Sequence, residues 1–155
     1  MKQSPQLQAA QACMAPGALT MDGFLGTDPR DLAEILEDDE GAVRRLGLAH
    51  EALAAGLHRL TERAIGGFGA PVTEGAFELC AWEAMGVLPC PFGEPGLHPK
   101  AVIEARRIDT GERLSWTALQ VHLIRAHGFY EGRGSPFRLE PPALARFLGL
   151  HPSPE

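Results

Sequence analysis

Apolar residues in the first half of the chain recur at the three- and four-residue spacing of amphipathic helices. Asp28 and Pro29 have the residue types of a helix cap and a first helical turn, and they precede the apolar positions Leu32 and Ile35. A second helical pattern covers residues 42–65, with a glycine turn inside it, and two glycines follow. The pattern therefore predicts a set of helices before residue 66.

The pattern changes after residue 70 from helical spacing to alternation. Residues 72–82 and 101–115 alternate apolar and polar side chains, which is typical of half-buried strands. A turn at 109–111 separates two short strands and favours antiparallel pairing. The segment 89–99 is dense in proline and glycine, so it is predicted to be a semi-rigid loop.

Two further helices follow this sheet. Ser115 is expected to cap a helix that carries two histidines and ends at Gly128, and residues 140–149 form a short helix begun by prolines. The fold class is therefore α+β: N-terminal helices pack on a small, mostly antiparallel sheet, with a His-bearing helix and a short C-terminal helix. Residues 24–150 are expected to form one domain.

The two ends of the chain lack a clear pattern. Residues 1–23 show no amphipathic periodicity, and Met21 offers a second plausible start. We expect these residues to be an arm that is disordered, that orders against a neighbour, or that precedes the true start. Residues 151–155 are expected to fray.

The charge and composition of the chain disfavour several classes of function. The chain has a formal net charge of -6, and residues 1–94 carry 6 basic and 14 acidic side chains. Nucleic acid is disfavoured as a partner, because phosphate binding relies on Lys and Arg. The sequence has no apolar run of membrane-spanning length, and its three cysteines are an odd number without a close pair. We therefore expect a cytoplasmic protein without disulfides.

Four side chains have the chemistry of a zinc site. Residues 119–127 resemble the helix half of a classical zinc finger, with His122 and His127 in place of its histidines. The cysteine half is missing from the hairpin, but Cys90 and His98 in the preceding loop complete a possible Cys-His-His-His set for zinc. Histidines five residues apart on a helix point ~140° apart, so this site is expected to require a distorted last turn.

A glycine-rich loop follows the His-bearing helix. Gly132, Arg133, Gly134 and Ser135 place backbone amides, a guanidinium and a hydroxyl in succession. Such amides can form a concave nest for phosphate or carboxylate, which makes these four residues a candidate anion site. The alternative is a structural loop anchored by its aromatic neighbours.

Two other functions compete with metal binding. Residues 42–60 have the apolar offsets of a DNA-binding helix-turn-helix, although the second helix offers no Lys or Arg before Arg59. For catalysis, Cys90 with a histidine would be a thiolate pair, and His122 with Glu131 or Glu112 would be an acid–base pair. A DNA-binding regulator and a metal-dependent or thiol enzyme therefore remain as alternatives.

One resemblance covers most of the chain. Residues 116–139, together with Leu88-Pro-Cys-Pro-Phe92, resemble a group of small bacterial cytosolic proteins without an assigned activity. This resemblance implies a single domain over 24–150 and transfers no catalytic residue. The favoured function is a non-enzymatic cytosolic binding or interaction module that zinc could stabilise through the four candidate ligands. Its partner is unknown and would be a second copy or another protein.

Overall fold

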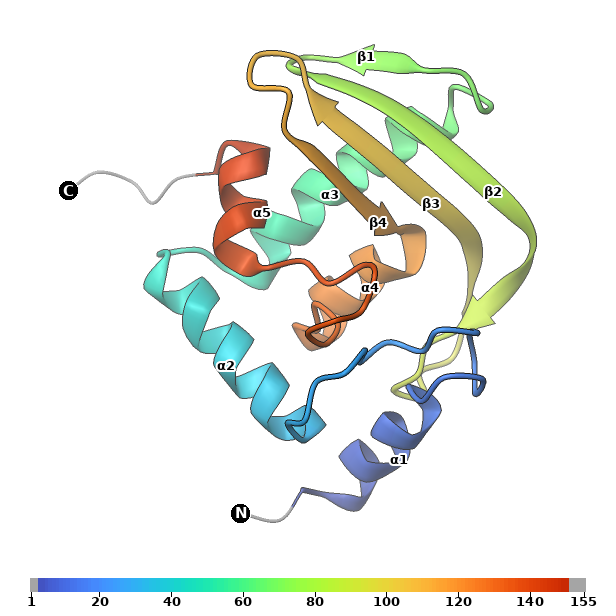
Figure 1. Ribbon diagram of the computed structural model, residues 1–155, viewed down its shortest axis with the longest axis vertical. Coiled ribbons are helices and arrows are strands. Elements are labelled where there is room, and N and C mark those ends of the chain that lie inside the picture. Colours follow the sequence, from blue (N-terminus) through green and yellow to red (C-terminus); the bar gives the residue numbers. More distant parts are fainter. Residues whose placement is uncertain (1–2, 151–155) are drawn as a thin grey trace.

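The computed structural model describes residues 3–150 and confirms the α+β class (Figure 1). Its elements in chain order are α1 (Pro5–Cys13), α2 (Leu32–Arg45), α3 (His50–Ile65), β1 (Val72–Glu74), β2 (Phe77–Pro89), β3 (Leu97–Arg107), β4 (Arg113–Thr117), α4 (Ala118–His127) and α5 (Pro141–Leu148). The predicted tail at 151–155 lies outside the described residues. Within those residues, no helix is both long and apolar enough to cross a bilayer.

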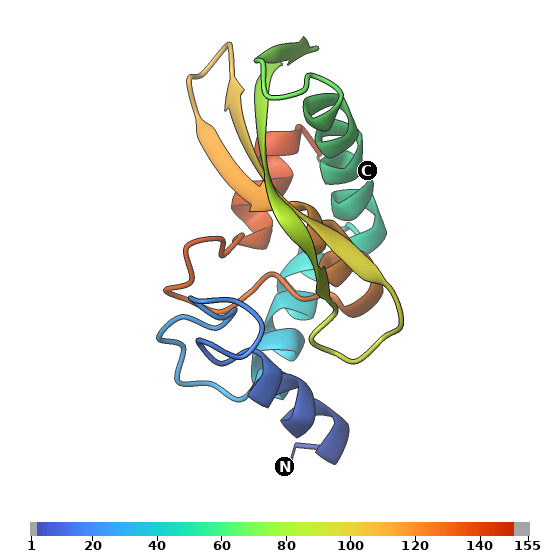
Figure 2. The ribbon, with the colours of Figure 1, turned by 90° about the vertical axis from the view of Figure 1, so that its right-hand side faces the viewer.

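The four strands form one antiparallel sheet in the order β1-β2-β3-β4. Along β2, Phe77, Leu79 and Ala81 are buried, whereas Glu78 and Trp82 on the other face are exposed. This alternation follows from the two-residue period of a strand and gives the sheet one apolar face. In two perpendicular views, α3, α4 and α5 lie on the same side of the sheet (Figures 1 and 2).

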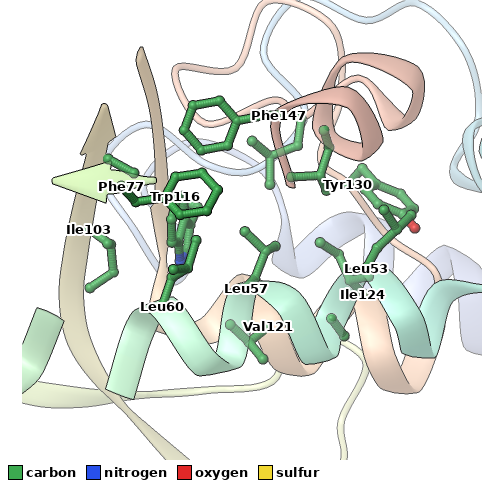
Figure 3. Packing of buried hydrophobic residues seen from close by; sticks show 14 of the residues in the cluster. Leu53, Leu57, Leu60, Phe77, Ile103, Trp116, Val121, Ile124, Tyr130 and Phe147 are labelled. Carbon is green, nitrogen blue, oxygen red and sulfur yellow. The ribbon is translucent and has the colours of Figure 1, made fainter. Parts of the chain in front are cut away.

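The main core lies between α3 and this sheet face (Figure 3). Leu57 and Leu60 of α3 pack in the same cluster as Ile103 of β3 and Trp116 of β4, and all four are fully buried. The indole Nε1 of Trp116 donates to Thr61 Oγ1 at 2.8 Å, so the one polar atom of this side chain is satisfied inside the core. The predicted position of α3 and its end at Gly66 are confirmed.

A second apolar cluster explains why the N-terminal arm is ordered. Its buried members are Ala10, Met14, Phe24, Leu32, Ile35, Cys90, Leu119, Leu123 and Phe129. Residues 5–13 form α1, whose Ala10 is buried, and Met14 after it has no exposed surface. α1 is thus a helix that the pattern of residues 1–23 did not predict. Its apolar residues are few and small, so the sequence shows little periodicity.

Two predicted helix caps are wrong, because Asp28 pairs with an arginine and Ser115 belongs to a strand. The first helix was expected to begin at Asp28, but α2 begins at Leu32 because the Asp28 carboxylate pairs with Arg30 at 2.7 Å. The helix after the sheet was expected to begin at Ser115, but β4 continues to Thr117. Thr117 caps α4 through a reciprocal capping box with Gln120.

The central hairpin is longer than the alternating pattern predicted. β2 continues to Pro89 and β3 starts at Leu97, so the predicted loop 89–99 shrinks to residues 90–96. Opposite this extension, the pairing register shifts between Ala84 and Val87. Residues 82–87 are exposed, and because neither face is covered by helices, their sequence lacks the alternation of a half-buried strand.

Candidate metal centre

The loop at the end of the β2–β3 hairpin lies against the last turns of α4. Cys90 follows β2 directly and is buried, with 4% of its surface exposed. His122 and His127 come from α4, which starts one residue after β4 and packs on β3. The direct connection from β4 into α4 therefore brings both histidines to the loop end of the β2–β3 hairpin.

Three of the four predicted zinc ligands meet at one point. One ligand atom each from Cys90, His122 and His127 lies within 4.8 Å of the other two. The Sγ of Cys90 is 3.5 Å from Nε2 of His127. Tetrahedral zinc, with Zn–S near 2.3 Å and Zn–N near 2.0–2.1 Å, would set this separation at ~3.6 Å. The separation of Cys90 Sγ and His127 Nε2 is thus compatible with a shared metal ion.

Glu94 is a neighbour of this group that sequence analysis missed. Its Oε1 lies 3.1 Å from Nε2 of His127, and its Oε2 lies 3.3 Å from Nε2 of His122. The second contact is close but lacks hydrogen-bond geometry, and His122 Nε2 is a buried nitrogen without a hydrogen-bond partner in residues 3–150. A buried, unpaired imidazole nitrogen is costly unless another group uses its lone pair or proton.

His98, the fourth predicted ligand, lies beside the group. Its ring centroid is 4.6 Å from that of His122, and it pairs across the hairpin with Leu88. It is not one of the three residues whose ligand atoms are mutually within 4.8 Å. Its role as a ligand stays a prediction.

The expected distortion of α4 is not needed. The two α4 rings lie 5.6 Å apart although the helix is regular through His127, and Gly128 ends it in the left-handed conformation with φ 62°. Instead, the hairpin loop supplies Glu94, which reaches both rings, and Phe92, which stacks on the His127 ring at 4.0 Å between centroids. The contacts of this loop fix the position of the last helical residue.

The surroundings of His127 and His98 favour neutral imidazoles at these two residues. Burial lowers the pKa of His127 and of His98, and the nearby carboxylate of Glu94 opposes this shift in both. Burial also raises the pKa of the Cys90 thiol, and the nearby backbone amides of residues 92–94 oppose this shift. Neutral imidazoles and a thiolate are the forms that bind a transition metal.

The predicted anion loop is held by internal acceptors. The amide of Gly132 donates to Phe24 O at 2.9 Å, and the amide of Arg133 donates to an Asp28 carboxylate oxygen at 3.0 Å. The hydroxyl of Ser135 donates to Glu131 Oε1 at 2.5 Å, and a side chain on Gly134 would collide with Thr27. The loop therefore already binds a carboxylate, that of Asp28, through the amide of Arg133. Binding of an external anion stays a prediction.

The other functional candidates are differently placed. Glu131 bonds to Ser135 and Glu112 pairs with Arg146, so neither reaches His122 as a proposed acid–base partner. The raised pKa of Cys90 disfavours a nucleophilic thiolate in the absence of a metal. These contacts leave metal binding as the chemistry that the group supports best.

The helix pair suggested for DNA binding is present as α2 and α3. Gly47 lies between the two helices with φ 72°. The exposed residues of α3 are mixed in charge: Glu51, Ala55, His58, Arg59, Glu62 and Arg63. Two arginines beside two glutamates give this face no net positive charge, so DNA binding stays a prediction without structural support.

Comparisons of the chain with protein-family models, with curated proteins and with solved structures found no match. The resemblance of residues 116–139 to small bacterial proteins is therefore an untested prediction. Function has to be inferred from the Cys90, His122 and His127 group itself, which is compatible with a bound metal ion.

Proposed function

We propose that this protein is a non-enzymatic binding module whose fold is stabilised by one zinc ion. The ion is held by Cys90, His122 and His127, and the observation that carries the proposal is the convergence of their ligand atoms within 4.8 Å. A thiolate and two imidazoles are a typical zinc donor set, whereas Mg²⁺ and Ca²⁺ prefer oxygen ligands.

Glu94 is the proposed fourth ligand. Its Oε1 lies 3.1 Å from Nε2 of His127 and its Oε2 lies 3.3 Å from Nε2 of His122, close to the ~3.3 Å expected between oxygen and nitrogen ligands on tetrahedral zinc. Like His98, Glu94 is outside the group of three whose ligand atoms lie mutually within 4.8 Å, so one of its oxygens would have to move closer to the other ligands when zinc binds. Four protein ligands close the coordination sphere, as in structural rather than catalytic zinc sites. His98 would then contact the ring of His122 beside the ion.

The proposed role of the ion is to join two elements that are distant in sequence. Cys90 and Glu94 lie on the hairpin loop, whereas His122 and His127 lie on α4. Zinc binding to the folded chain alone would stabilise it by mass action, because the unfolded chain lacks the assembled site. Loss of the ion would loosen the loop 90–96 first.

Metal analysis of the purified chain tests this proposal. We expect about one zinc per chain, loss of zinc in Cys90→Ser, and a higher melting temperature for wild type with zinc than after chelation. Cys13→Ser is the matched control, because Cys13 is an exposed free cysteine outside the group. Less than a tenth of an equivalent in protein never exposed to chelator, with no uptake of added zinc, would refute the site.

A metal-dependent enzyme is the second candidate, because the site reaches solvent. The side chains of His122, His127 and Glu94 are 24%, 16% and 44% exposed. If water takes the fourth position, Glu94 would act on that water as a general base. Cobalt-substituted protein separates the two: added thiocyanate would alter the visible spectrum of an open site and leave the closed site unchanged.

A further inference from the structure

An apolar pocket lies beside the extended half of the β2–β3 hairpin, away from the metal centre. It is an open pocket with a volume of about 730 Å³, lined by the strands, the start of α4 and the 17–21 segment. Its apolar lining includes Leu19, Met21, Trp82, Leu88, Val102 and Leu119. Trp82 is 52% exposed and Met21 87% exposed, so hydrocarbon surface at its mouth is in contact with water.

A smaller inner pocket of about 120 Å³ adjoins this one. The two share five lining residues, which are Thr20, Met21, Leu88, Thr117 and Leu119. The inner pocket is also lined by Phe24, Phe137 and the acidic residue Glu131. The two adjoining pockets, called the joined pockets below, thus have a mostly apolar lining in the larger one and a buried acidic residue in the smaller one.

Glu131 is held in a fixed position beside this inner pocket. It is only 3% exposed, and its Oε1 accepts a hydrogen bond from Ser135 Oγ. Its backbone has φ 67°, in the left-handed region that non-glycine residues rarely adopt, and its carbonyl accepts from Arg138 Nη1. Such strain in a buried acidic residue is typical of functional positions. Within residues 3–150, no cation pairs with the Glu131 carboxyl group.

The charges that line the joined pockets select the sign of a ligand. Asp22 and Glu131 line the inner pocket, and Glu83 lines the outer pocket, against the single cation Lys100. Three carboxyl groups against one ammonium favour a cationic group over an anionic one. A buried carboxylate without a cation gains most from a ligand that supplies both a positive charge and N–H donors.

We propose that the joined pockets bind an amphiphilic amine, with its hydrocarbon chain against Trp82 and Leu88 and its ammonium group at Glu131. Apolar side chains supply most of the contact area, and the single acidic group fixes the orientation, as in other small-molecule sites. Val102 and Trp82 lie on the outer face of the sheet, whereas Leu119 and Phe24 belong to the second apolar cluster, so the site borders that cluster. None of the proposed zinc ligands lines either pocket.

Decylamine is the probe, used below its micelle concentration with the full-length protein at about pH 8, where Glu131, with a pKa of about 7, is mostly ionised and the amine is still protonated. We expect one decylamine per chain by calorimetry, together with a change in Trp82 fluorescence that disappears in Trp82→Phe. Glu131→Gln keeps the shape of the side chain and removes its charge, so it should weaken binding at least tenfold. Ala84→Trp, at an exposed strand position that lines the outer pocket, should weaken binding as strongly.

Ligand controls use the wild-type chain alone. Decanoate and decanol have the same hydrocarbon length, and each should bind at least tenfold more weakly than decylamine. This comparison decides the outcome even if Glu131→Gln does not fold. Equal affinity for decylamine in wild type and folded Glu131→Gln, decanoate binding as tightly as decylamine, or several amines per chain without saturation would each overturn the proposal.

Discussion

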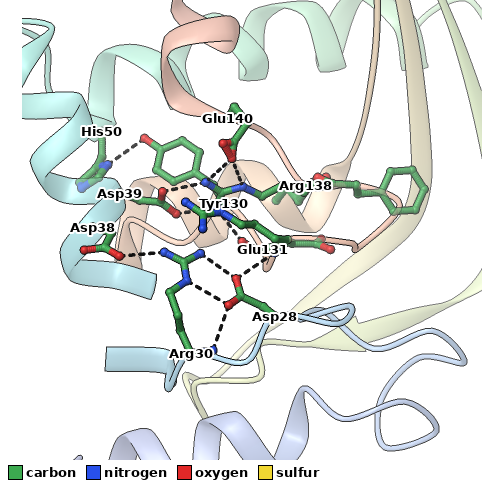
Figure 4. A network of polar contacts seen from close by, with 12 residues as sticks. Asp28, Arg30, Asp38, Asp39, His50, Tyr130, Glu131, Arg138 and Glu140 are labelled. Carbon is green, nitrogen blue, oxygen red and sulfur yellow. Dashed lines mark hydrogen bonds and ion pairs between the residues drawn. The ribbon is translucent and has the colours of Figure 1, made fainter. Parts of the chain in front are cut away.

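Arg138 donates hydrogen bonds to both carboxylate oxygens of Asp39, a residue 99 positions earlier in the chain (Figure 4). Its Nη1 and Nη2 lie 2.6 and 2.8 Å from Oδ2 and Oδ1, and the two side chains are 9% and 5% exposed. The same guanidinium donates to the backbone carbonyl of Glu131 at 2.8 Å. The ion pair thus connects α2 to the loop that follows α4.

Replacing Asp39 with alanine should lower the free energy of unfolding by about 3 kcal/mol, because it leaves a largely buried guanidinium without its main partner. Glu140, which is 51% exposed, would offset part of the loss. Glu40→Ala is the matched control: its pair with Arg44 is exposed, so it should cost less than about 1 kcal/mol. Equal destabilisation of the two variants in urea denaturation would contradict this assignment.

Gly128→Ala should destabilise the protein more than Gly149→Ala, although both glycines end helices with positive φ. Alanine in this conformation costs about 1 kcal/mol at either position. A Cβ on Gly128 would also lie 2.6 Å from His50 Nε2, whereas one on Gly149 meets nothing closer than 3.9 Å. Thermal denaturation of both variants measures the difference.

The collision at Gly128 has a second consequence. Nδ1 of His50 lies 2.8 Å from the hydroxyl of Tyr130, which is fully buried. Moving the His50 ring to accommodate a Cβ would disturb this contact, and we expect a cost of about 2 kcal/mol or more in total. Similar melting temperatures for the two variants would show that the His50 ring moves freely.

Local signals in the sequence predicted the ends of α3 and α4 at Gly66 and Gly128, and both ends of α5. The short helix after Glu140 has two prolines in its first turn and a left-handed glycine at its end, as expected. The start of α2 was wrong because Asp28 is a good capping residue that also has a neighbouring arginine, and the ion pair prevailed. Such a competition between two local contacts of one side chain is decided by the fold.

Long-range contacts account for what the sequence could not provide. The pattern of cysteine and histidine predicted three side chains that the structure brings together, because these residue types are uncommon and chemically specific. Glu94 was missed because an acidic residue in a Pro- and Gly-rich loop is ordinary, and only the approach of α4 places it against His122 and His127. Asp39 and Arg138 were missed for the same reason.

The proposed zinc ligand Glu94 can be distinguished from His98 by substitution. Glu94→Gln should weaken zinc binding by about ten- to a hundredfold, since it removes a charged ligand, whereas His98→Ala should leave the affinity within a few fold. His58→Ala is the matched control, because His58 is exposed on α3. Competition with a chromogenic zinc chelator measures all three. A larger loss in His98→Ala than in Glu94→Gln would assign the fourth position to His98.

Glu131 should make folding less favourable as the pH rises through the range 4.5 to 7. Burial raises its pKa from 4.5 to about 7 in the folded protein. Between these two values the unfolded chain has lost this proton and the folded chain still holds it, so the free energy of unfolding falls as the pH rises. The stabilising contribution is complete below pH 4.5 and is lost by pH 7, and a shift of this size corresponds to about 3 kcal/mol.

Other groups titrate with the opposite sign, so the measurement must be a difference. The lowered pKa values of His50, His98 and His127 add stability as the pH rises toward 6.5, and the lowered pKa of Asp28 acts only in stronger acid. Glu131→Gln cannot ionise, so its stability relative to wild type should increase by about 3 kcal/mol between pH 4.5 and 8. Urea denaturation at five or six pH values measures this difference for both proteins, and a constant difference would mean that the Glu131 carboxyl group is ionised in the folded state throughout the range.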